Sequence, residues 1–254
     1  MPFAHVGGHR IEYERITVAR DDRPTLVLLH EGLGSIAMWR DFPGRLAHAT
    51  GCNAVVYSRY GYGKSDPLRE ARGVRYMHDE AFAALPELID ELAIPWPILV
   101  GHSDGGSLAL IHAGTGKRAV TGVVTLAAHV LVEDVSVASI TAAKTAFATT
   151  DLRARLARYH DDVDAMFRGW NDIWLHPDFR AWNIEEYLPG IACPVLAIQG
   201  EDDEYGTMEQ MRRIGAKVKD VELLALEDCR HSPHRDQPDA VLEAVTRFVD
   251  RIAA

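Results

Sequence analysis

One serine, Ser103, lies between an apolar run and a run that favours a helix. The apolar residues Ile98–Val100 precede it, and the helix-forming residues Ser107–Ala113 follow it. Gly101 and Gly105 flank the serine and complete the pattern G-x-S-x-G. A strand that turns directly into a helix needs glycines there, because side chains would collide with the opposing backbone. The sequence therefore predicts that Ser103 lies on a tight, strained turn at the carboxyl end of a central strand.

Strand-like and helix-like segments alternate along most of the chain. Short, continuous apolar runs are typical of strands that are buried on both faces of a parallel sheet. We expect such strands at Thr25–Leu29, Cys52–Tyr57, Ile98–Val100, Gly122–Ala127, Pro194–Gln199 and Val221–Leu226. We expect a hairpin or edge strands at Gly8–Val18, a turn at Asp21–Pro24, and helices at Met38–Ala49, Met77–Leu92, Ser107–Ala113, Thr207–Val218 and Pro238–Ile252. This alternation predicts an α/β fold with a mostly parallel central sheet flanked by helices.

The alternation stops between Glu133 and Leu188. We expect four helical segments there instead, at Ser139–Ala148, Leu152–Tyr159, Val163–Leu175 and Trp182–Tyr187. This stretch is rich in large aromatic side chains, namely Phe167, Trp170, Trp174 and Trp182. We interpret residues 133–188 as a helical cap inserted into a core formed by residues 1–132 and 189–254. The alternative is an ordinary helical layer whose aromatic side chains belong to the core.

Four short motifs occur in an order that one known family shares. They are Leu29-His30-Glu31-Gly32, the G-x-S-x-G at Ser103, Gly200-x-x-Asp203, and His231-x-Pro233 before the last helix. With these motifs the chain resembles the α/β-hydrolase fold family, of the cap-bearing serine esterase type, over nearly its whole length. The resemblance implies an α/β-hydrolase fold with a helical cap insertion.

Four residues depart from the usual motifs of that family. Glu31 replaces the glycine of His-Gly-X, and Arg230 stands where a glycine commonly precedes the histidine. Ser58 and Tyr60 replace the acid and the arginine of D-x-R-G-x-G-x-S. None of these changes removes a group that the chemistry needs, but Glu31 leaves the conformation of its loop open.

A serine hydroxyl needs a base to take its proton as it attacks, and histidine titrates in the right range. The family order of serine, acid and histidine implies that Ser103 is the nucleophile and His231 the base. Asp203 would then accept a hydrogen bond from His231 and fix its tautomer.

Several residues compete with these assignments. His234 is the alternative base, and Asp202 is the alternative acid in the same loop. Glu133 or Asp134 could supply the acid from the segment after an earlier strand. Ser103 itself could be a plain capping serine at a strand-to-helix turn.

Two backbone N–H groups are expected to bind the oxyanion of the tetrahedral intermediate. The resemblance places these donors at Gly32 and Asp104, with Leu33 as an alternative to Gly32. Leu33, Trp170 and Trp174 are candidate substrate-binding residues, because the two tryptophans are spaced i, i+4 and share a helix face.

The side chain of Asp104 has two competing interpretations. It could receive the α-ammonium group of an amino-acid ester, as in amino-acid ester hydrolases of this family. Alternatively, it caps the helix after Ser103 or pairs with a nearby residue such as Arg59.

The formal net charge of −10 argues against nucleic acid or an anionic membrane as a partner. The three cysteines, Cys52, Cys193 and Cys229, form no C-x-x-C pair, which is typical of reduced thiols. We find no secretion signal or membrane span and expect a cytoplasmic protein. There is no dinucleotide fingerprint, P-loop or H-E-x-x-H, so we expect no cofactor and no metal.

These features favour a serine hydrolase that cleaves a small carboxylic ester through an acyl-enzyme. The same triad would serve a C–C bond hydrolase or a lactonase. A different class of function, a non-catalytic ligand receptor on a hydrolase scaffold, is the third hypothesis. The expected partner is a small-molecule ester, and the sequence leaves formation of a homo-oligomer open.

Overall fold

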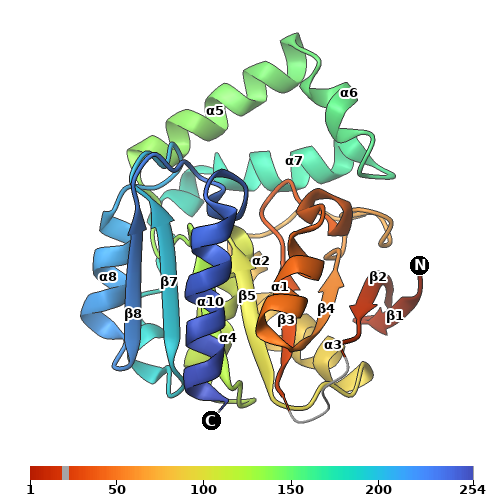
Figure 1. Cartoon of the computed structure of the whole chain (residues 1–254). Coiled ribbons are helices and arrows are strands. Elements are labelled where there is room, and N and C mark those ends of the chain that lie inside the picture. The colour runs from red at the N-terminus through yellow and green to blue at the C-terminus, as the bar shows by residue number, and fades with distance from the viewer. Residues whose placement is uncertain (19–22, 254) are drawn as a thin grey trace.

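The apolar runs of the sequence form the strands of one sheet (Figure 1). The computed structural model describes residues 1–18 and 23–253, so Asp21 and Asp22 of the expected turn lie outside the described residues. Within these residues the sheet has eight strands in the order β1-β2-β4-β3-β5-β6-β7-β8. The strands are β1 (Phe3–Val6), β2 (His9–Ile16), β3 (Thr25–Leu29), β4 (Asn53–Tyr57), β5 (Pro97–His102), β6 (Gly122–Leu126), β7 (Val195–Gly200) and β8 (Val221–Leu226).

Strands β3 to β8 pair in parallel, whereas β2 pairs antiparallel with both β1 and β4. This arrangement confirms the expected mostly parallel sheet. The hairpin at its edge begins earlier than expected, because its first strand is β1 and only β2 lies within Gly8–Val18. Strand β5, which leads into Ser103, lies between β3 and β6 in the middle of the sheet.

Alternate residues of each central strand enter two different hydrophobic cores. In β3, Leu26 and Leu28 pack on one face of the sheet, and Val27 and Leu29 pack on the other. Because both faces are buried, the strand reads as a continuous apolar run.

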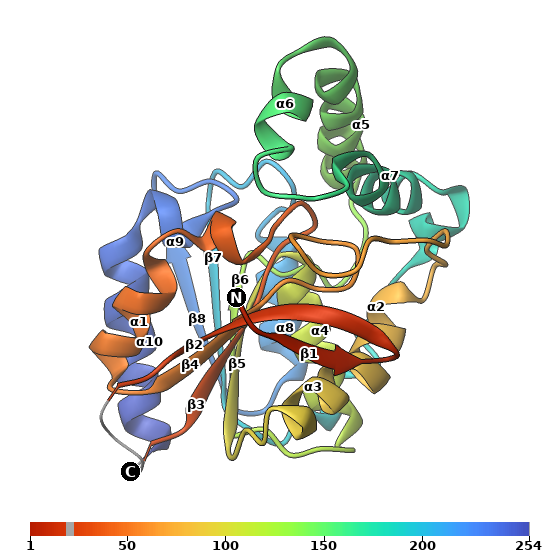
Figure 2. The same ribbon diagram turned by 90° about the vertical axis from the view of Figure 1, so that its right-hand side faces the viewer.

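Helices cover both faces of the sheet, as Figure 2 shows. One face carries α1 (Phe42–Thr50), α9 (Pro233–Asp236) and α10 (Pro238–Ile252). The other face carries α2 (Tyr76–Asp79), η2 (Glu80–Ala84), α3 (Leu85–Glu91), α4 (Asp104–Thr115) and α8 (Glu209–Lys217). No helix in the described ranges is both long enough and apolar enough to cross a membrane.

Two of the expected helices contain a proline and are not regular α-helices throughout. The segment Met38–Ala49 is divided into a 3-10 helix, η1 (Ile36–Trp39), and α1, which has Pro43 in its first turn. The segment Met77–Leu92 contains the π-helical turn η2 immediately before α3, which has Pro86 in its first turn. A proline has no N–H to donate, so it favours the first turn of a helix over the interior.

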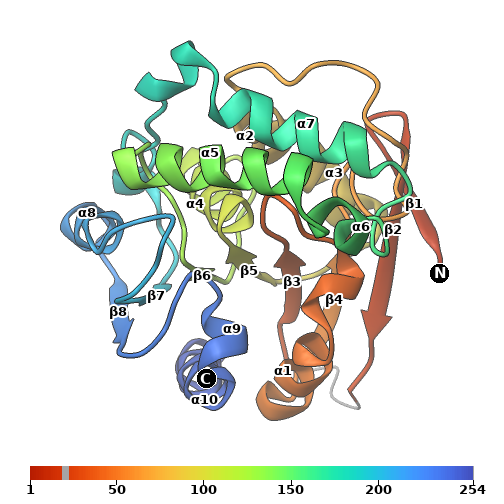
Figure 3. The same ribbon diagram turned by 90° about the horizontal axis from the view of Figure 1, so that it is seen from above.

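A helical segment lies over the carboxyl ends of the parallel strands, as Figures 1 and 3 show. It comprises α5 (Asp134–Thr149), α6 (Leu152–Leu156), α7 (Val163–Trp174) and η3 (Pro177–Ala181). The short helix η4 (Leu188–Gly190) follows it and packs against the C-terminal end of α4, away from these strand ends. Three of the four helices expected here are present, although α6 ends earlier than expected.

The prediction of a helix at Trp182–Tyr187 is wrong. Asn183 instead pairs with Leu131 in an isolated antiparallel bridge. The N–H of Ile184 donates to the carbonyl of Val130 at 2.9 Å. The Asn183 side chain also accepts a bond from the N–H two residues on. Such local bonds compete with helix formation, so the segment is not helical and pairs with the chain after β6.

Close backbone contact at the junction of β5 and α4 explains the two glycines there. A Cβ atom at Gly101 would collide with the backbone of Gly105. A Cβ atom at Gly105 would collide with the carbonyl of Leu29 on the neighbouring strand. Since the atoms on the other side are backbone, no side-chain rotation can relieve the collision.

We expect Gly105→Ala to lower the free energy of unfolding by about 1–3 kcal/mol or more, because the added methyl group overpacks this contact. Gly44→Ala is the matched control: Gly44 lies in α1, and nothing lies within 4 Å of the added Cβ. This control should raise stability by up to about 1 kcal/mol, since alanine favours a helix. Denaturant unfolding of both variants checks this, and equal effects at the two sites would contradict it.

Candidate active site

Ser103 occupies a strained position between β5 and α4. Its φ angle is 51° and its ψ angle is −117°, values that residues with a Cβ rarely adopt. Its N–H donates to the carbonyl of Leu126 on β6 at 2.8 Å, which holds the turn against the sheet. The strain is therefore imposed by the packing around the turn, as is typical of functional positions.

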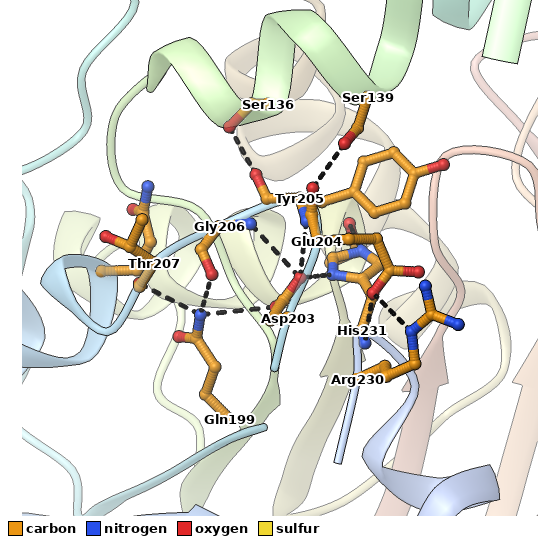
Figure 4. Close-up of polar contacts among 12 residues, drawn as sticks. Ser136, Ser139, Gln199, Asp203, Glu204, Tyr205, Gly206, Thr207, Arg230 and His231 are labelled. Atoms are coloured by element: carbon orange, nitrogen blue, oxygen red, sulfur yellow. Dashed lines mark hydrogen bonds and ion pairs between the residues drawn. The ribbon is translucent and has the colours of Figure 1, made fainter. Parts of the chain in front are cut away.

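The side chain of Ser103 lies against His231, in the loop after β8. The Ser103 Oγ atom is 3.0 Å from Nε2 of His231. The Nδ1 atom of the same ring is 2.8 Å from Oδ1 of Asp203, as Figure 4 shows. A carboxylate accepts hydrogen bonds, so Nδ1 carries the proton and Nε2 presents a lone pair to the serine hydroxyl. The three residues thus form a continuous hydrogen-bonded chain.

Asp203 is held as a carboxylate by the loop after β7. Its Oδ1 atom also accepts bonds from the N–H groups of Tyr205 at 2.8 Å and Gly206 at 3.2 Å (Figure 4). Burial by itself raises the pKa of Asp203, but the hydrogen bonds from His231 and Tyr205 and the charge of His231 outweigh it. The pKa of Asp203 therefore lies below its ordinary value, and the group remains an acceptor at neutral pH.

The structure places the competing residues elsewhere. His234 is buried against Trp39, with 4.8 Å between ring centroids, and Asp202 is exposed. Glu133 instead accepts hydrogen bonds from Thr207 and Gln210. Asp134 forms a surface ion pair with Arg180.

The expected oxyanion donors lie on either side of the nucleophile. Asp104 is the first residue of α4, where a backbone N–H has no acceptor within the helix. Gly32 lies in the loop after β3, directly beneath the indole of Trp170 from α7, which leaves no room for a Cβ at this glycine. The carbonyl of Leu33 accepts a bond from Nε2 of His160 at 3.0 Å.

Both tryptophans of α7 reach the region of the triad from above the sheet. Trp170 contacts the Gly32 loop, and Trp174 donates its Nε1–H to the hydroxyl of Tyr76 at 3.2 Å. Trp174 also packs edge-on against His129, which itself lies 5.7 Å from the His231 ring. All of these side chains are nearly or fully buried, so α7 closes over the site.

The carboxylate of Asp104 is paired inside the protein. Its Oδ2 atom accepts a bond from the hydroxyl of Tyr76 at 2.7 Å and lies 3.7 Å from a guanidinium nitrogen of Arg59. The Asp104 and Arg59 side chains are each 1% exposed, and Arg59 also contacts Glu80 at 3.2 Å. This geometry supports the interpretation that Asp104 is a structural acid paired with Arg59.

Two residues that depart from the family motifs, Ser58 and Glu31, lie against polar groups of other residues. The hydroxyl of Ser58 donates to Glu12 at 2.6 Å and accepts the N–H of Ile36 at 3.0 Å. Glu31 lies 3.4 Å from Nδ1 of His102, the residue before the nucleophile. Both replacements thus belong to buried polar contacts that a single motif does not reveal.

Sequence reasoning missed three residues around His231. The ring of Tyr205 lies 4.6 Å from that of His231, and Glu204 accepts the backbone N–H of His231 at 3.1 Å. Burial and the neighbouring His231 lower the pKa of His129 to about 4, so its ring is neutral at neutral pH. Glu204 and Tyr205 directly follow Asp203 in the sequence, and this closeness is the one sequence feature that could have indicated them.

The helix α5 is hydrogen-bonded to the loop that carries the acid (Figure 4). Ser136 donates to the carbonyl of Tyr205, and Ser139 donates to the carbonyl of Glu204. The helical segment above the sheet is therefore connected directly to the residues that surround Asp203. Among the described residues, no group of three or more His, Cys, Asp or Glu side chains could hold a metal ion.

A model of the alpha/beta hydrolase family matches residues 26–244. The proline iminopeptidase of Saccharolobus solfataricus is 23% identical over 98% of this chain and 92% of its own length. A crystal structure from work on carboxylesterases of Nitrososphaera gargenis has a TM-score of 0.78 at 19% identity, covering 99% of this chain and 98% of the other. The enol-lactonase of Burkholderia xenovorans has a TM-score of 0.77 at 22% identity, covering 98% and 100%. These two structures share the fold of this chain.

We expect Asp203→Asn and His231→Ala to lose most activity, because each removes one bond of the chain that ends at Ser103. Asp202→Asn and His234→Ala are the matched controls and should retain most of it. Initial rates with an ester substrate check these four variants. If the severe and mild members of either pair exchanged places, the assignment for that loop would be wrong.

We expect Arg59→Gln to lower the free energy of unfolding by about 3 kcal/mol or more, since it leaves the buried charge of Asp104 without its partner. The double variant Arg59→Gln/Asp104→Asn should recover part of this loss. Arg45→Gln is the control, because the pair of Arg45 with Asp239 is exposed and should contribute little. Denaturant unfolding measures these variants together with the single variant Asp104→Asn, and additive effects of the two single substitutions would contradict the coupling.

Proposed function

The chain belongs to the alpha/beta hydrolase family, and we propose that it is a serine hydrolase that cleaves a small carboxylic ester. The observation that carries this proposal is the hydrogen-bonded chain of Ser103, His231 and Asp203, with distances of 3.0 and 2.8 Å. We propose Ser103 as the nucleophile, His231 as the general base and acid, and Asp203 as the acceptor that fixes the histidine tautomer.

The proposed reaction proceeds in two steps. Ser103 Oγ attacks the ester carbonyl carbon while its proton passes to Nε2 of His231, and the N–H groups of Gly32 and Asp104 bind the oxyanion. The intermediate collapses, and the leaving alkoxide takes the proton from His231. A water molecule then attacks the acyl-enzyme with the help of His231, which releases the carboxylic acid and restores the serine.

We further propose that residues 133–188 form a cap that selects the acyl group. The contact of Trp170 with the Gly32 loop supports this, because the indole lies beside the proposed oxyanion donor. Leu33 and Trp174 would complete the contacts with the substrate. The three free cysteines support a reducing compartment, so we propose a cytoplasmic location.

A second candidate is removal of an N-terminal amino acid, as the name of the Saccharolobus relative suggests. The same triad would attack an amide carbonyl in place of an ester. Lactone hydrolysis and C–C bond hydrolysis would also use this triad, and the fold is shared with an enol-lactonase. A non-catalytic receptor is disfavoured by the intact chain of hydrogen bonds at Ser103.

An assay with p-nitrophenyl esters of increasing acyl length, a lactone and proline p-nitroanilide tests these candidates against one another. We expect hydrolysis of short esters, and a fall in kcat on the order of 10⁴- to 10⁶-fold in Ser103→Ala. A fluorophosphonate should label the wild-type protein and not this variant. A preference for the anilide would establish the second candidate. If the protein showed neither labelling nor turnover, the non-catalytic receptor would be the remaining hypothesis.

The same ester panel tests the role of the cap. We expect Trp170→Ala to shift the preference towards bulkier acyl groups, because truncation opens space next to Gly32. Trp182→Phe is the control, since Trp182 packs against Phe179 and Trp174 in the same segment. An unchanged preference together with a lower melting temperature in Trp170→Ala would make the tryptophan a core residue.

A further inference from the structure

The backbone of His231 is held by two side chains that lie outside the Ser-His-Asp chain. Its N–H donates to Oε2 of Glu204 at 3.1 Å, a residue that Figure 4 shows beside it. Its carbonyl accepts a bond from Nε2 of His102 at 2.7 Å. With Nδ1 bonded to Asp203, every polar group of His231 except Nε2 is engaged. Nε2 alone faces Ser103.

The contacts of His102 determine where its protons lie. A carbonyl can only accept a hydrogen bond, so Nε2 of His102 carries a proton. The other ring nitrogen, Nδ1, lies 3.4 Å from Oε2 of Glu31. The carboxylate of Glu31 thus faces the edge of the His102 ring that is opposite the bond to His231.

The surroundings of Glu31 favour its ionised form. Burial by itself raises the pKa of Glu31, but the hydrogen bond and charge of His102 lower it far below its ordinary value. Arg235 adds positive charge near Glu31, whereas burial lowers the pKa of His30 well below its ordinary value. His234, whose ring lies 4.9 Å from that of His102, is kept neutral because burial lowers its pKa. The side chains of His102 and Glu31 are 2% and 17% exposed, so solvent screens the pair little.

We propose that Glu31 and His102 form a positioning pair that fixes the carbonyl of His231 and thereby keeps its Nε2 at hydrogen-bond distance from Ser103. His102 directly precedes Ser103 in the chain. Its hydrogen bond to His231 therefore fixes the position of the proposed base relative to the proposed nucleophile. This proposal rests on the proposed function, in which His231 activates Ser103. It also gives Glu31, which replaces a glycine of the family motif, a role within this chain.

The variants are chosen to separate positioning from general stability. His102→Leu and His102→Phe remove the bond to the carbonyl of His231. His102→Gln supplies an uncharged amide that can donate to the same carbonyl. His112→Leu is the matched control, because His112 is also a buried histidine whose ring nitrogen bonds to a backbone carbonyl, that of Ala81 at 2.9 Å.

The readouts are kcat and KM for a short ester, the rate at which a fluorophosphonate inactivates Ser103, and the melting temperature. We expect His102→Leu and His102→Phe to lower kcat and the inactivation rate by roughly 10- to 100-fold with little change in KM, because small misplacement of a catalytic group has effects of this size. His102→Gln should retain most of both rates. His112→Leu should lower the melting temperature and leave both rates unchanged.

The fluorophosphonate reaction distinguishes failure of this proposal from failure of the proposed function. A wild-type protein that does not react would overturn the function itself. A wild-type protein that reacts, together with a folded His102→Leu or His102→Phe variant that reacts equally fast, would overturn the positioning role alone.

The protonation state is tested on the wild-type protein by NMR of ¹⁵N-labelled histidines, with His102 assigned by comparison with His102→Gln. We expect Nε2 of His102 to be protonated at neutral pH, because it donates to the carbonyl of His231. An unprotonated Nε2 in the wild-type protein would overturn the proposal, whether or not the hydrophobic variants fold.

Discussion

The rest of the structure depends on how closely β5 and α4 approach each other at Ser103. The backbone of Gly105 lies against the carbonyl of Leu29 with no room for a side chain, and Ser103 is held at a φ angle of 51°. Such a conformation is unfavourable for a residue with a Cβ, so it persists only where the surrounding sheet enforces it. The central place of β5, between β3 and β6, provides that support and directs the serine to the carboxyl edge of the sheet.

Two acidic side chains near this turn lie against nitrogen-bearing side chains. Asp104 is paired with the guanidinium of Arg59, and Glu31 lies 3.4 Å from Nδ1 of His102. Charges in a region of low dielectric are costly unless they are paired and hydrogen-bonded. The pairs do not make the site more stable than apolar packing would. They allow acidic side chains to lie next to Ser103, which we propose to be the nucleophile.

The helical segment above the sheet is connected to the triad by more than packing. The hydroxyls of Ser136 and Ser139 bond to the loop of Asp203, and Trp170 covers Gly32 on the opposite side of the site. A displacement of this segment would therefore move both the loop of Asp203 and the loop of Gly32, which we propose to bind the oxyanion. The position of this segment is thus coupled to the alignment of the groups that we propose to be catalytic.

The sequence by itself determined the fold class, because buried parallel strands and the glycines at the tight turn leave strong local patterns. Asp203 and His231 were proposed from the resemblance of their motifs to the α/β-hydrolase family. Local patterns also indicated the edge strand β2 and most helices, but they failed at Trp182–Tyr187, where pairing with Leu131 overrides helix propensity. Only the tertiary structure decided that Asp203 and not Asp202 faces His231, and that Arg59 partners Asp104. These choices depend on contacts between residues far apart in the chain, and such contacts leave no local periodicity to read.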